Sequence, residues 1–375
     1  HIWLPLSKKR DRKKMMLFGA MVTPRVSDWM LIKDIENMGF GSVWLPDSHM
    51  IYSDTYAVLS LAAANTSKIK LGTGIAVAPT RIAPVTAHSI ATINQLAPGR
   101  TFLGIGTGHT GMRVMGMDPI KVGEFREYLR VTRALLHGEE IDYTLNGKTR
   151  DIKFLHPDDG FINVESPVPI YVAADGPLAL QAAGIYGDGR ICSHNQSKAL
   201  LKDSLETIKL GAQKAQRVLP ETFNTTVLTY ACVLKPGESI TSERVIDEIG
   251  SMAIASLHYW WELYKNDGVT STIARSCHAI WEEYLEFTEQ MEIPLEKRYQ
   301  KVHLGHCAYI LPEERRFVTE NLIRSTGGLV GTPEEIIGMI RDREAMGLTE
   351  IALLPGMEFA RKNLSDFSTH VIERY

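Results

Sequence analysis

Residues 68–116 read KIKLGTGIAVAPTRIAPVTAHSIATINQLAPGRTFLGIGTGHTGMRVMG, and this stretch decides the fold. Apolar residues alternate with small or polar ones over 69–75, as in a short strand, and recur at helical spacing over 85–96. A second apolar run, 101–105, follows a Pro-Gly turn and leads into a glycine-rich turn at 106–111. Strand, helix and strand in so short a span predict a βαβ unit with parallel strands. In parallel α/β folds the chemistry lies where such strands end, so both glycine-rich ends are candidate site positions.

Strand and helix signals alternate along the rest of the chain. Helical spacing recurs between the strand signals, for example over 28–38 and 123–137. Thr332 and Glu335 predict the capping box of a last long helix. This alternation predicts a (β/α)₈ TIM barrel, with a doubly wound open sheet as the alternative. The eight expected strands are 17–22, 42–45, 69–74, 101–106, 168–174, 189–193, 225–234 and 350–354.

Two segments depart from this alternation. Residues 140–167 carry no clear helix signal, and Asn146-Gly147 predicts a β-hairpin turn within them. Residues 235–327, between the seventh and eighth strands, are largely helical in pattern and rich in aromatic side chains. A connection of this length is too long for an ordinary loop, so we expect a helical insertion that caps the barrel. We expect residues 17–375 to form one barrel domain that includes this insertion.

The composition narrows the class of protein. The 375 residues are 44% hydrophobic and 23% charged, with a formal net charge of −3, as in a globular protein. No apolar run reaches the roughly 18 residues of a membrane helix, so no membrane span is expected. The small net charge gives no reason to expect a nucleic acid or an anionic membrane as a partner. Four widely spaced cysteines favour reduced thiols in the cytoplasm: Cys192, Cys232, Cys277 and Cys307.

The first 16 residues form a separate segment. Residues 8–14 are a dense basic run, preceded by an apolar segment too short for a signal peptide. A solvated tail, a cloning remnant or a start assigned too far upstream is favoured over nucleic-acid binding. Met15 or Met16 is a natural start, because a strand is expected immediately afterwards.

The expected strand ends carry many small and polar residues. Small residues at these positions let the backbone approach a flat ligand closely. The strand ends read Met21–Thr23, Asp47–His49, Gly74–Ala76, Gly106–His109, Ala174–Gly176, Ser193–Asn195 and Pro355–Gly356.

Motifs at these strand ends resemble a known family. The motifs are LGTGIAVAPTR, GRTFLGIGTGH, the strand-end Asp47 and VAADGP. They are similar to the bacterial-luciferase-like superfamily, nearest its deazaflavin-dependent branch, which includes methylenetetrahydromethanopterin reductase and a glucose-6-phosphate dehydrogenase. The likeness covers roughly residues 17–235 and 327–356 and leaves the expected insertion unmatched.

The resemblance implies where a cofactor binds. It implies a β-bulge with a non-prolyl cis peptide at Gly74-Ile75 beneath the cofactor ring, where an ordinary strand end is the plainer interpretation. The turn Gly106-Thr107-Gly108 would line the polar edge or tail of the cofactor. The helix start at Gly176-Pro177 would hold a phosphate, as free helix N-termini do, provided that Asp175 points away. Further implied cofactor contacts are Asp47, Ala174, Ser193 and His194.

The residue that transfers a proton is less well defined by the sequence. The family has an Asp near the cofactor and substrate, which makes Asp47 a catalytic candidate, although capping of the next turn is an alternative. Ser48 stands where several deazaflavin-dependent members carry a His, and His109 stands where the glucose-6-phosphate dehydrogenase carries a Glu. We therefore expect His49 or His109 to take over, because imidazole titrates near neutral pH.

A possible metal motif occurs within the expected insertion. His303-x-x-His306-Cys307 brings three potential ligands together in the sequence. Without further ligands at a suitable spacing this pattern does not indicate a metal site, and we expect no metal ion. The aromatic side chains of the same segment favour a core over a substrate pocket.

The resemblance implies an oxidoreductase that transfers a hydride between the deazaflavin coenzyme F-420 and a small organic substrate. Flavin mononucleotide (FMN) is the alternative cofactor. An FMN-dependent monooxygenase that uses O₂ is an alternative function, and a non-catalytic flavin-binding protein is an alternative of another class. The substrate stays open, and we expect a homodimer or a higher homo-oligomer.

Overall fold

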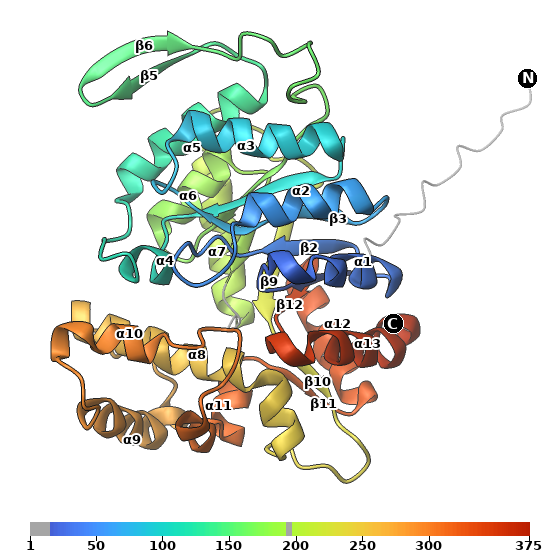
Figure 1. Ribbon diagram of the computed structural model, residues 1–375, viewed down its shortest axis with the longest axis vertical. Coiled ribbons are helices and arrows are strands. Elements are labelled where there is room, and N and C mark those ends of the chain that lie inside the picture. The colour runs from blue at the N-terminus through green and yellow to red at the C-terminus, as the bar shows by residue number, and fades with distance from the viewer. Residues whose placement is uncertain (1–15, 193–196) are drawn as a thin grey trace, which may run out of the picture.

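A closed barrel forms the centre of the computed structural model, which describes residues 16–192 and 197–375 (Figure 1). Eight parallel strands follow the order β1-β12-β9-β8-β7-β4-β3-β2. The first and last strands pair, with Leu17 opposite Glu350, so the predicted TIM barrel is confirmed and an open sheet is excluded. The barrel strands are β1 (Leu17–Met21), β2 (Ser42–Leu45), β3 (Lys70–Val77), β4 (Thr101–Gly106), β7 (Ile170–Ala173), β8 (Gly189–Cys192), β9 (Asn224–Thr229) and β12 (Glu350–Leu353).

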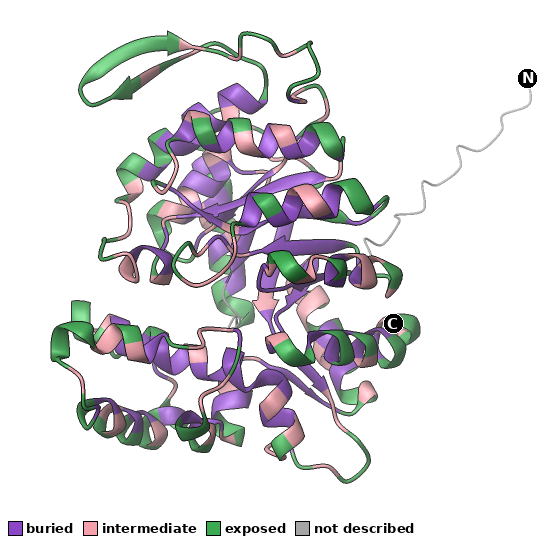
Figure 2. Ribbon diagram, in the orientation of Figure 1, coloured by how far each residue is buried: buried purple, intermediate pink, exposed green. Residues whose placement is uncertain are grey.

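Helices cover the outside of the barrel and bury their apolar faces against it (Figure 2). The predicted capping box opens α12: Thr332 accepts the N–H of Glu335, whose carboxylate accepts the N–H of Thr332. The same helix ends at Gly347, whose φ of 106° is readily adopted by glycine. The covering helices are α1 (Met30–Asn37), α2 (Thr55–Asn65), α3 (Ala83–Leu96), α4 (Thr110–Arg113), α5 (Val122–Leu136), α6 (Pro177–Tyr186), α7 (Lys198–Lys214), α12 (Pro333–Met346) and α13 (Ala360–His370).

The predicted hairpin is present and projects from one side of the molecule (Figure 1). It consists of β5 (Ile141–Leu145) and β6 (Lys148–Ile152), paired antiparallel. Asn146 and Gly147 have φ values of 52° and 73°, the left-handed geometry that a two-residue hairpin turn needs.

The expected strand 225–234 is wrong in its extent, because it is two strands. β9 leaves the barrel after Thr229, and Ala231–Val233 forms β10, which pairs in parallel with β11 (Leu329–Gly331) outside the barrel. The backbone leaves the barrel at Tyr230, whose carbonyl accepts the N–H of Leu329 at 2.8 Å. A run rich in β-branched residues indicates a strand but does not say which partner each part will find.

Aromatic side chains fill the barrel interior. Trp44, Phe102 and Tyr171 lie against one another, with ring centroids 4.4–5.6 Å apart. At the amino ends of the strands the buried carboxylate of Glu350 accepts hydrogen bonds from Trp44 Nε1 at 3.1 Å and Asn224 Nδ2 at 2.6 Å. Hydrogen bonds of this kind satisfy a buried charge, and they make this end of the barrel a stabilising layer.

A mainly helical region connects β10 to β11. Its aromatic core is continuous with the barrel interior, since Trp44 and Trp260 belong to one buried cluster. The N–H of Met357, which follows β12, donates to the carbonyl of Ala308 at 2.7 Å, so the region contacts a strand-end loop. A single insertion over 235–327 that caps the barrel stays a prediction. The region contains α8 (Glu243–Asp267), α9 (His278–Glu289), α10 (Arg298–Val302) and α11 (Glu320–Ser325).

The folded part includes a residue that we expected in the basic tail. Met16 is buried within the core that joins the barrel to its covering helices. The basic run 8–14 lies outside the described residues. None of the described helices combines the length and the apolar character of a membrane span.

Candidate active site at the carboxyl ends of the strands

The predicted bulge is present at the carboxyl end of β3. The peptide bond between Gly74 and Ile75 is cis. The register between β3 and β4 shifts there, because Thr73 pairs with Leu103 while Ala76 pairs with Ile105.

The strand-end glycines are required by the packing of the protein itself. A Cβ on Gly74 would lie 2.6 Å from Cβ of Trp44, and a Cβ on Gly106 would lie 2.4 Å from Cδ1 of Ile75. Gly108 has a φ of 78°, and its Cβ would meet Val77 at 2.2 Å. Close packing therefore explains these three glycines without a ligand, and their part in cofactor binding, with that of Thr107, stays a prediction.

Asp47 is a buried carboxylate at the end of β2. Its side chain is 3% exposed, and Arg81 Nη1 lies 2.8 Å from its Oδ2. Its backbone N–H donates to the carbonyl of Ile75 at 3.3 Å, which ties it to the bulge. Burial raises the pKa of Asp47, while the positive charge of Arg81 and the neighbouring His49 act in the opposite direction.

Arg81 is the site residue that sequence reasoning missed. Its guanidinium joins Asp47 to Asp54, with Nη2 2.9 Å from Asp54 Oδ2, and it lies 4.5 Å from the ring centre of Tyr56. Tyr128 Oη donates to its carbonyl at 2.7 Å, which fixes the loop after β3. The motif LGTGIAVAPTR contains this residue, so a signal was present in the sequence.

His49 belongs to the same network and is exposed. Its Nε2 lies 3.2 Å from Arg81 Nη1 and 3.5 Å from Asp47 Oδ1. Because a guanidinium only donates hydrogen bonds, the contact with Arg81 fits a neutral His49 with its lone pair on Nε2. The structure thus brings the two predicted catalytic residues Asp47 and His49 together.

His109 lies at the end of β4 and faces α8. Its ring meets the ring of Tyr259 edge-on, with centroids 5.9 Å apart. The side chain is exposed at the surface, yet the surrounding chain desolvates it and lowers its pKa, against the opposite effect of Glu262. The segment after His109 lies close to the end of β2, because a Cβ on Gly111 would be 3.9 Å from the carbonyl oxygen of Asp47.

The predicted phosphate position is the N-terminus of α6, directly after β7. No side chain of the described residues caps this helix, Pro177 occupies its first turn, and Gly176 has open space around its Cβ position. Asp175 is held by Arg190, whose Nη2 lies 2.8 Å from its Oδ1, and Arg190 Nε donates to the carbonyl of Ala174 at 2.7 Å. The other expected contacts, Ser193 and His194, lie outside the described residues.

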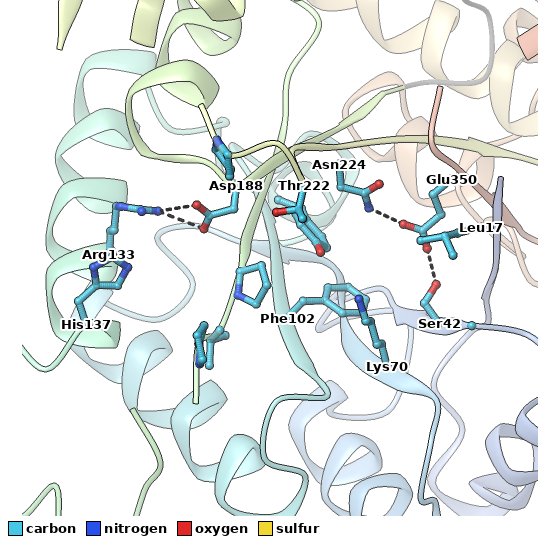
Figure 3. Close-up of a pocket in the computed structure, with 16 residues that line it drawn as sticks. Leu17, Ser42, Lys70, Phe102, Arg133, His137, Asp188, Thr222, Asn224 and Glu350 are labelled. Atoms are coloured by element: carbon cyan, nitrogen blue, oxygen red, sulfur yellow. Dashed lines mark hydrogen bonds and ion pairs between the residues drawn. The ribbon is translucent and has the colours of Figure 1, made fainter. Parts of the chain in front are cut away.

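A cavity of about 600 Å³ lies at the opposite end of the barrel (Figure 3). Its wall contains the first residues of several strands, among them Leu17, Ser42 and Lys70. Its charged groups are largely paired, as shown by the contacts of Asp188 with Arg133 at 3.1 Å and of Glu350 with Asn224. In such barrels this end serves stability, so we do not assign the reaction to it.

The chain is similar to several characterised proteins. It is 35% identical over 226 residues to a 5,10-methylenetetrahydromethanopterin reductase from Methanolobus tindarius, with 58% of this chain and 65% of the relative aligned. It is 33% identical over 207 residues to an F420-dependent glucose-6-phosphate dehydrogenase from Beutenbergia cavernae, with 50% and 58% aligned. The chain thus spans less than two thirds of the length of these relatives.

Solved structures share the fold. A coenzyme F420 dependent tetrahydromethanopterin reductase from Methanopyrus kandleri superposes with a TM-score of 0.67 at 21% identity, covering 96% of this chain and 99% of that one. A monooxygenase from Streptomyces bottropensis superposes with a TM-score of 0.62 at 16% identity, covering 96% and 100%. At these identities the likeness concerns the fold alone.

The family is settled by a match that spans most of the chain. The family model described as luciferase-like monooxygenase matches residues 30–350, which include the Asp47 network, the bulge in β3 and the start of α6. The chain therefore belongs to the luciferase-like monooxygenase family.

Proposed function

We propose that this protein is an oxidoreductase that transfers a hydride between the deazaflavin coenzyme F-420 and a small organic substrate. The observation that carries the proposal is the family match over residues 30–350. The name of one relative supports the choice of coenzyme, since the glucose-6-phosphate dehydrogenase at 33% identity is F420-dependent.

The strand-end residues fit such a coenzyme. The start of α6 offers backbone N–H groups that no described side chain caps, at the helix end where phosphate binding is favoured. Gly176 and Pro177 would hold the phosphate there, with Gly74-Ile75 and Gly106-Thr107-Gly108 beside the ring. When bound, the coenzyme supplies or accepts the hydride, and the protein supplies position, a water-poor surrounding and a proton.

The side chains around Asp47 provide groups for positioning and for moving a proton. Arg81 keeps the Asp47 carboxylate in one orientation through a contact of 2.8 Å. His49, held against Arg81, and His109, held against Tyr259, are both partly exposed imidazoles at strand ends. Either imidazole can give a proton to, or take one from, a substrate oxygen or nitrogen as the hydride moves.

Turnover by purified protein tests this proposal. Oxidised F-420 would be mixed with glucose 6-phosphate and with secondary alcohols, and reduced F-420 with methylenetetrahydromethanopterin, while the coenzyme absorbance is followed. We expect an absorbance change with at least one substrate of these chemical classes. Substitution of the responsible histidine, His49→Gln or His109→Gln, should lower kcat about 10²–10⁴-fold. Unchanged turnover in both variants would contradict the proton-transfer role.

An FMN-dependent monooxygenase is the second candidate function. The description of the matching family and the fold shared with a monooxygenase support it. Oxygen consumption with reduced FMN, together with no coenzyme turnover in the F-420 assay, would favour it. Binding of either cofactor without any turnover would favour a non-catalytic flavin-binding protein.

We also propose a cellular compartment and an oligomeric state for the protein. All four cysteines are free thiols, and three are buried, which supports a reducing compartment such as the cytoplasm. We expect a homodimer or a higher homo-oligomer, and sedimentation equilibrium of the purified chain measures this directly.

A further inference from the structure

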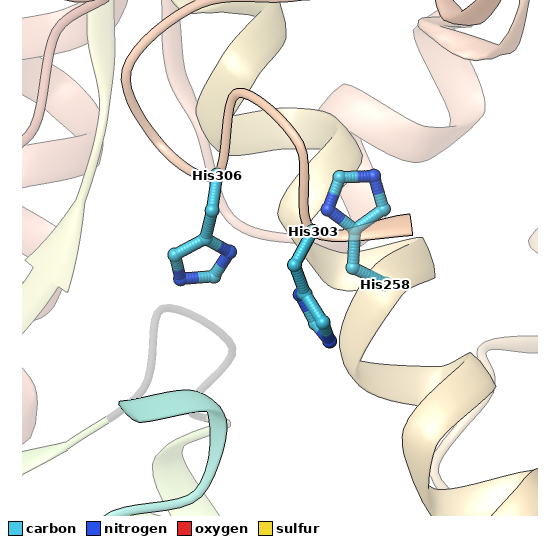
Figure 4. A group of neighbouring side chains, drawn as sticks. All are labelled: His258, His303 and His306. Carbon is cyan, nitrogen blue, oxygen red and sulfur yellow. The ribbon is translucent and has the colours of Figure 1, made fainter. Parts of the chain in front are cut away.

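Three histidines outside the Asp47 network form a cluster within the helical region. His258 lies on α8, His303 follows the last residue of α10, and His306 comes three residues later. Each ring offers a nitrogen within 4.8 Å of those offered by the other two. The three rings turn toward a common point (Figure 4). His258 and His303 are 1% and 4% exposed, and His306 is half-buried.

The outer nitrogen of each ring has a partner. His258 Nε2 lies 2.9 Å from Glu314 Oε1, and His303 Nε2 lies 2.7 Å from Glu262 Oε1. His306 Nε2 lies 3.6 Å from the sulfur of Cys307. Because a carboxylate accepts hydrogen bonds, Nε2 of His258 and Nε2 of His303 each carry a proton.

The inner nitrogens have no such partner. Nδ1 of His258, His303 and His306 is buried, and none of the three has a hydrogen-bond partner among residues 16–192 and 197–375. In a ring whose one proton is on Nε2, as the carboxylate contacts favour for His258 and His303, Nδ1 is an acceptor with an unused lone pair. Several unsatisfied acceptors buried close together are costly, and a bound cation removes that cost.

The surroundings match those of a metal ligand. Imidazole suits Zn²⁺ and neighbouring transition metals, and metal-binding histidines commonly donate their other N–H to a carboxylate, as His258 and His303 do. Zn–N bonds of about 2.1 Å hold tetrahedral donor atoms about 3.4 Å apart, so the observed limit of 4.8 Å requires only small ring movements.

We propose that His258, His303 and His306 bind a divalent transition-metal ion, Zn²⁺ in the first place, with water in a fourth position. The sequence pattern His303-x-x-His306 alone did not indicate this site, because the third ligand comes from a distant helix. The Cys307 sulfur is not among the ligand atoms that lie within 4.8 Å of one another. It contacts Nε2 of His306 instead, at 3.6 Å.

Such an ion would join two parts of the helical region that are distant in the sequence. It would join α8 to the segment that ends at His306, and the carbonyl of His306 accepts a hydrogen bond from Tyr52, which follows β2. The site is separate from the proposed hydride-transfer residues, because its three ligands lie outside the Asp47 network and the start of α6.

Zinc binding by the full chain tests the proposal. The purified protein would be stripped with a chelator, and Zn²⁺ then titrated in competition with a chelating indicator. We expect one tightly bound Zn²⁺ per chain and a higher Tm with Zn²⁺. His306→Gln should weaken binding by at least about 100-fold, and Glu262→Gln, which removes the carboxylate behind His303, by about 10–100-fold. The matched control His278→Gln, an exposed histidine on α9, should bind like the unaltered protein.

The contrary result is equally clear. Equal zinc affinity in the unaltered protein and in His306→Gln would overturn the proposal. If His306→Gln does not fold, the visible spectrum of Co²⁺ added to the unaltered protein tests the site instead. The visible spectrum of four-coordinate Co²⁺ with nitrogen ligands supports the site, and its absence together with an unchanged Tm in Zn²⁺ overturns it.

Discussion

At the scale of single residues, one buried carboxylate organises the carboxyl end of the barrel. Asp47 is 3% exposed, and its nearest cation, Arg81, is itself shared with Asp54 on the surface. A buried charge is tolerated when such a partner is present and becomes costly when the partner is removed. Arg81 therefore contributes to stability as well as to the shape of the site.

Arg81→Gln should be strongly destabilising, because it leaves Asp47 charged and unpaired. We expect the free energy of unfolding to fall by about 2–3 kcal/mol, measured by urea denaturation near pH 7. Arg81→Lys should cost less, since it keeps the charge but not both carboxylate contacts. The control Arg130→Gln breaks two more exposed ion pairs, with Glu127 and Asp142, and should cost less than about 1 kcal/mol. Equal losses in Arg81→Gln and Arg130→Gln would contradict this account of Asp47.

At the scale of elements, the start of α6 differs from several other helix starts in the molecule. Side chains cap α2, α7, α8, α11 and α12, whereas no described side chain caps α6. Its first N–H groups and its dipole are therefore available to an anion. The open space at Gly176 makes this position suitable for substitution.

Gly176→Asp should stabilise the protein and weaken cofactor binding at once. The backbone at Gly176, with φ −82° and ψ 154°, accepts a side chain, and a capping carboxylate adds about 0.5–2 kcal/mol to helix stability. The same carboxylate would repel a phosphate and occupy its donors, weakening binding by about 1–2 kcal/mol, or roughly 5–30-fold. Gly176→Ala, which adds no charge, is the control and should leave affinity almost unchanged. Unaltered cofactor affinity in Gly176→Asp would exclude this helix start as the phosphate site.

A second element-scale feature ties α1 to the chain entering β3. Oε1 of Glu36 accepts the N–H groups of Ser67, Lys68 and Ile69 at 2.7–3.1 Å. Burial raises the pKa of Glu36, but the hydrogen bond from Lys33 and these backbone N–H groups outweigh it and lower the pKa to about 2.

This pKa shift predicts a pH-dependent stability. The folded-state pKa of about 2 lies below the unfolded value of 4.5, so the folded state binds fewer protons within that window. The stabilisation by Glu36 is present above 4.5 and is lost as the pH falls toward about 2. Glu36→Gln should cost about 1–2 kcal/mol near pH 7, after allowance for screening by solvent. Urea denaturation should give a smaller difference near pH 3, and a constant difference would contradict the assignment.

At the scale of the whole molecule, the barrel could be predicted because each strand signal is followed by a helix signal. The pairing of β10 with β11 could not be predicted. These are two three-residue strands separated by almost 100 residues, and neither shows in its own sequence which partner it will pair with. The sequence places Arg81 after β3, but it does not show that the guanidinium of Arg81 points toward Asp47. His258 was likewise missed as a partner of His303, because folding rather than spacing brings them together.

The central claim concerns the cofactor, and one binding measurement tests it most directly. Purified protein would be equilibrated by dialysis against F-420 and, separately, against FMN, and the bound amount determined by absorbance. We predict saturable binding of F-420, with FMN at least about tenfold weaker, a difference of about 1.4 kcal/mol. Tight binding of FMN with no measurable affinity for F-420 would contradict the account.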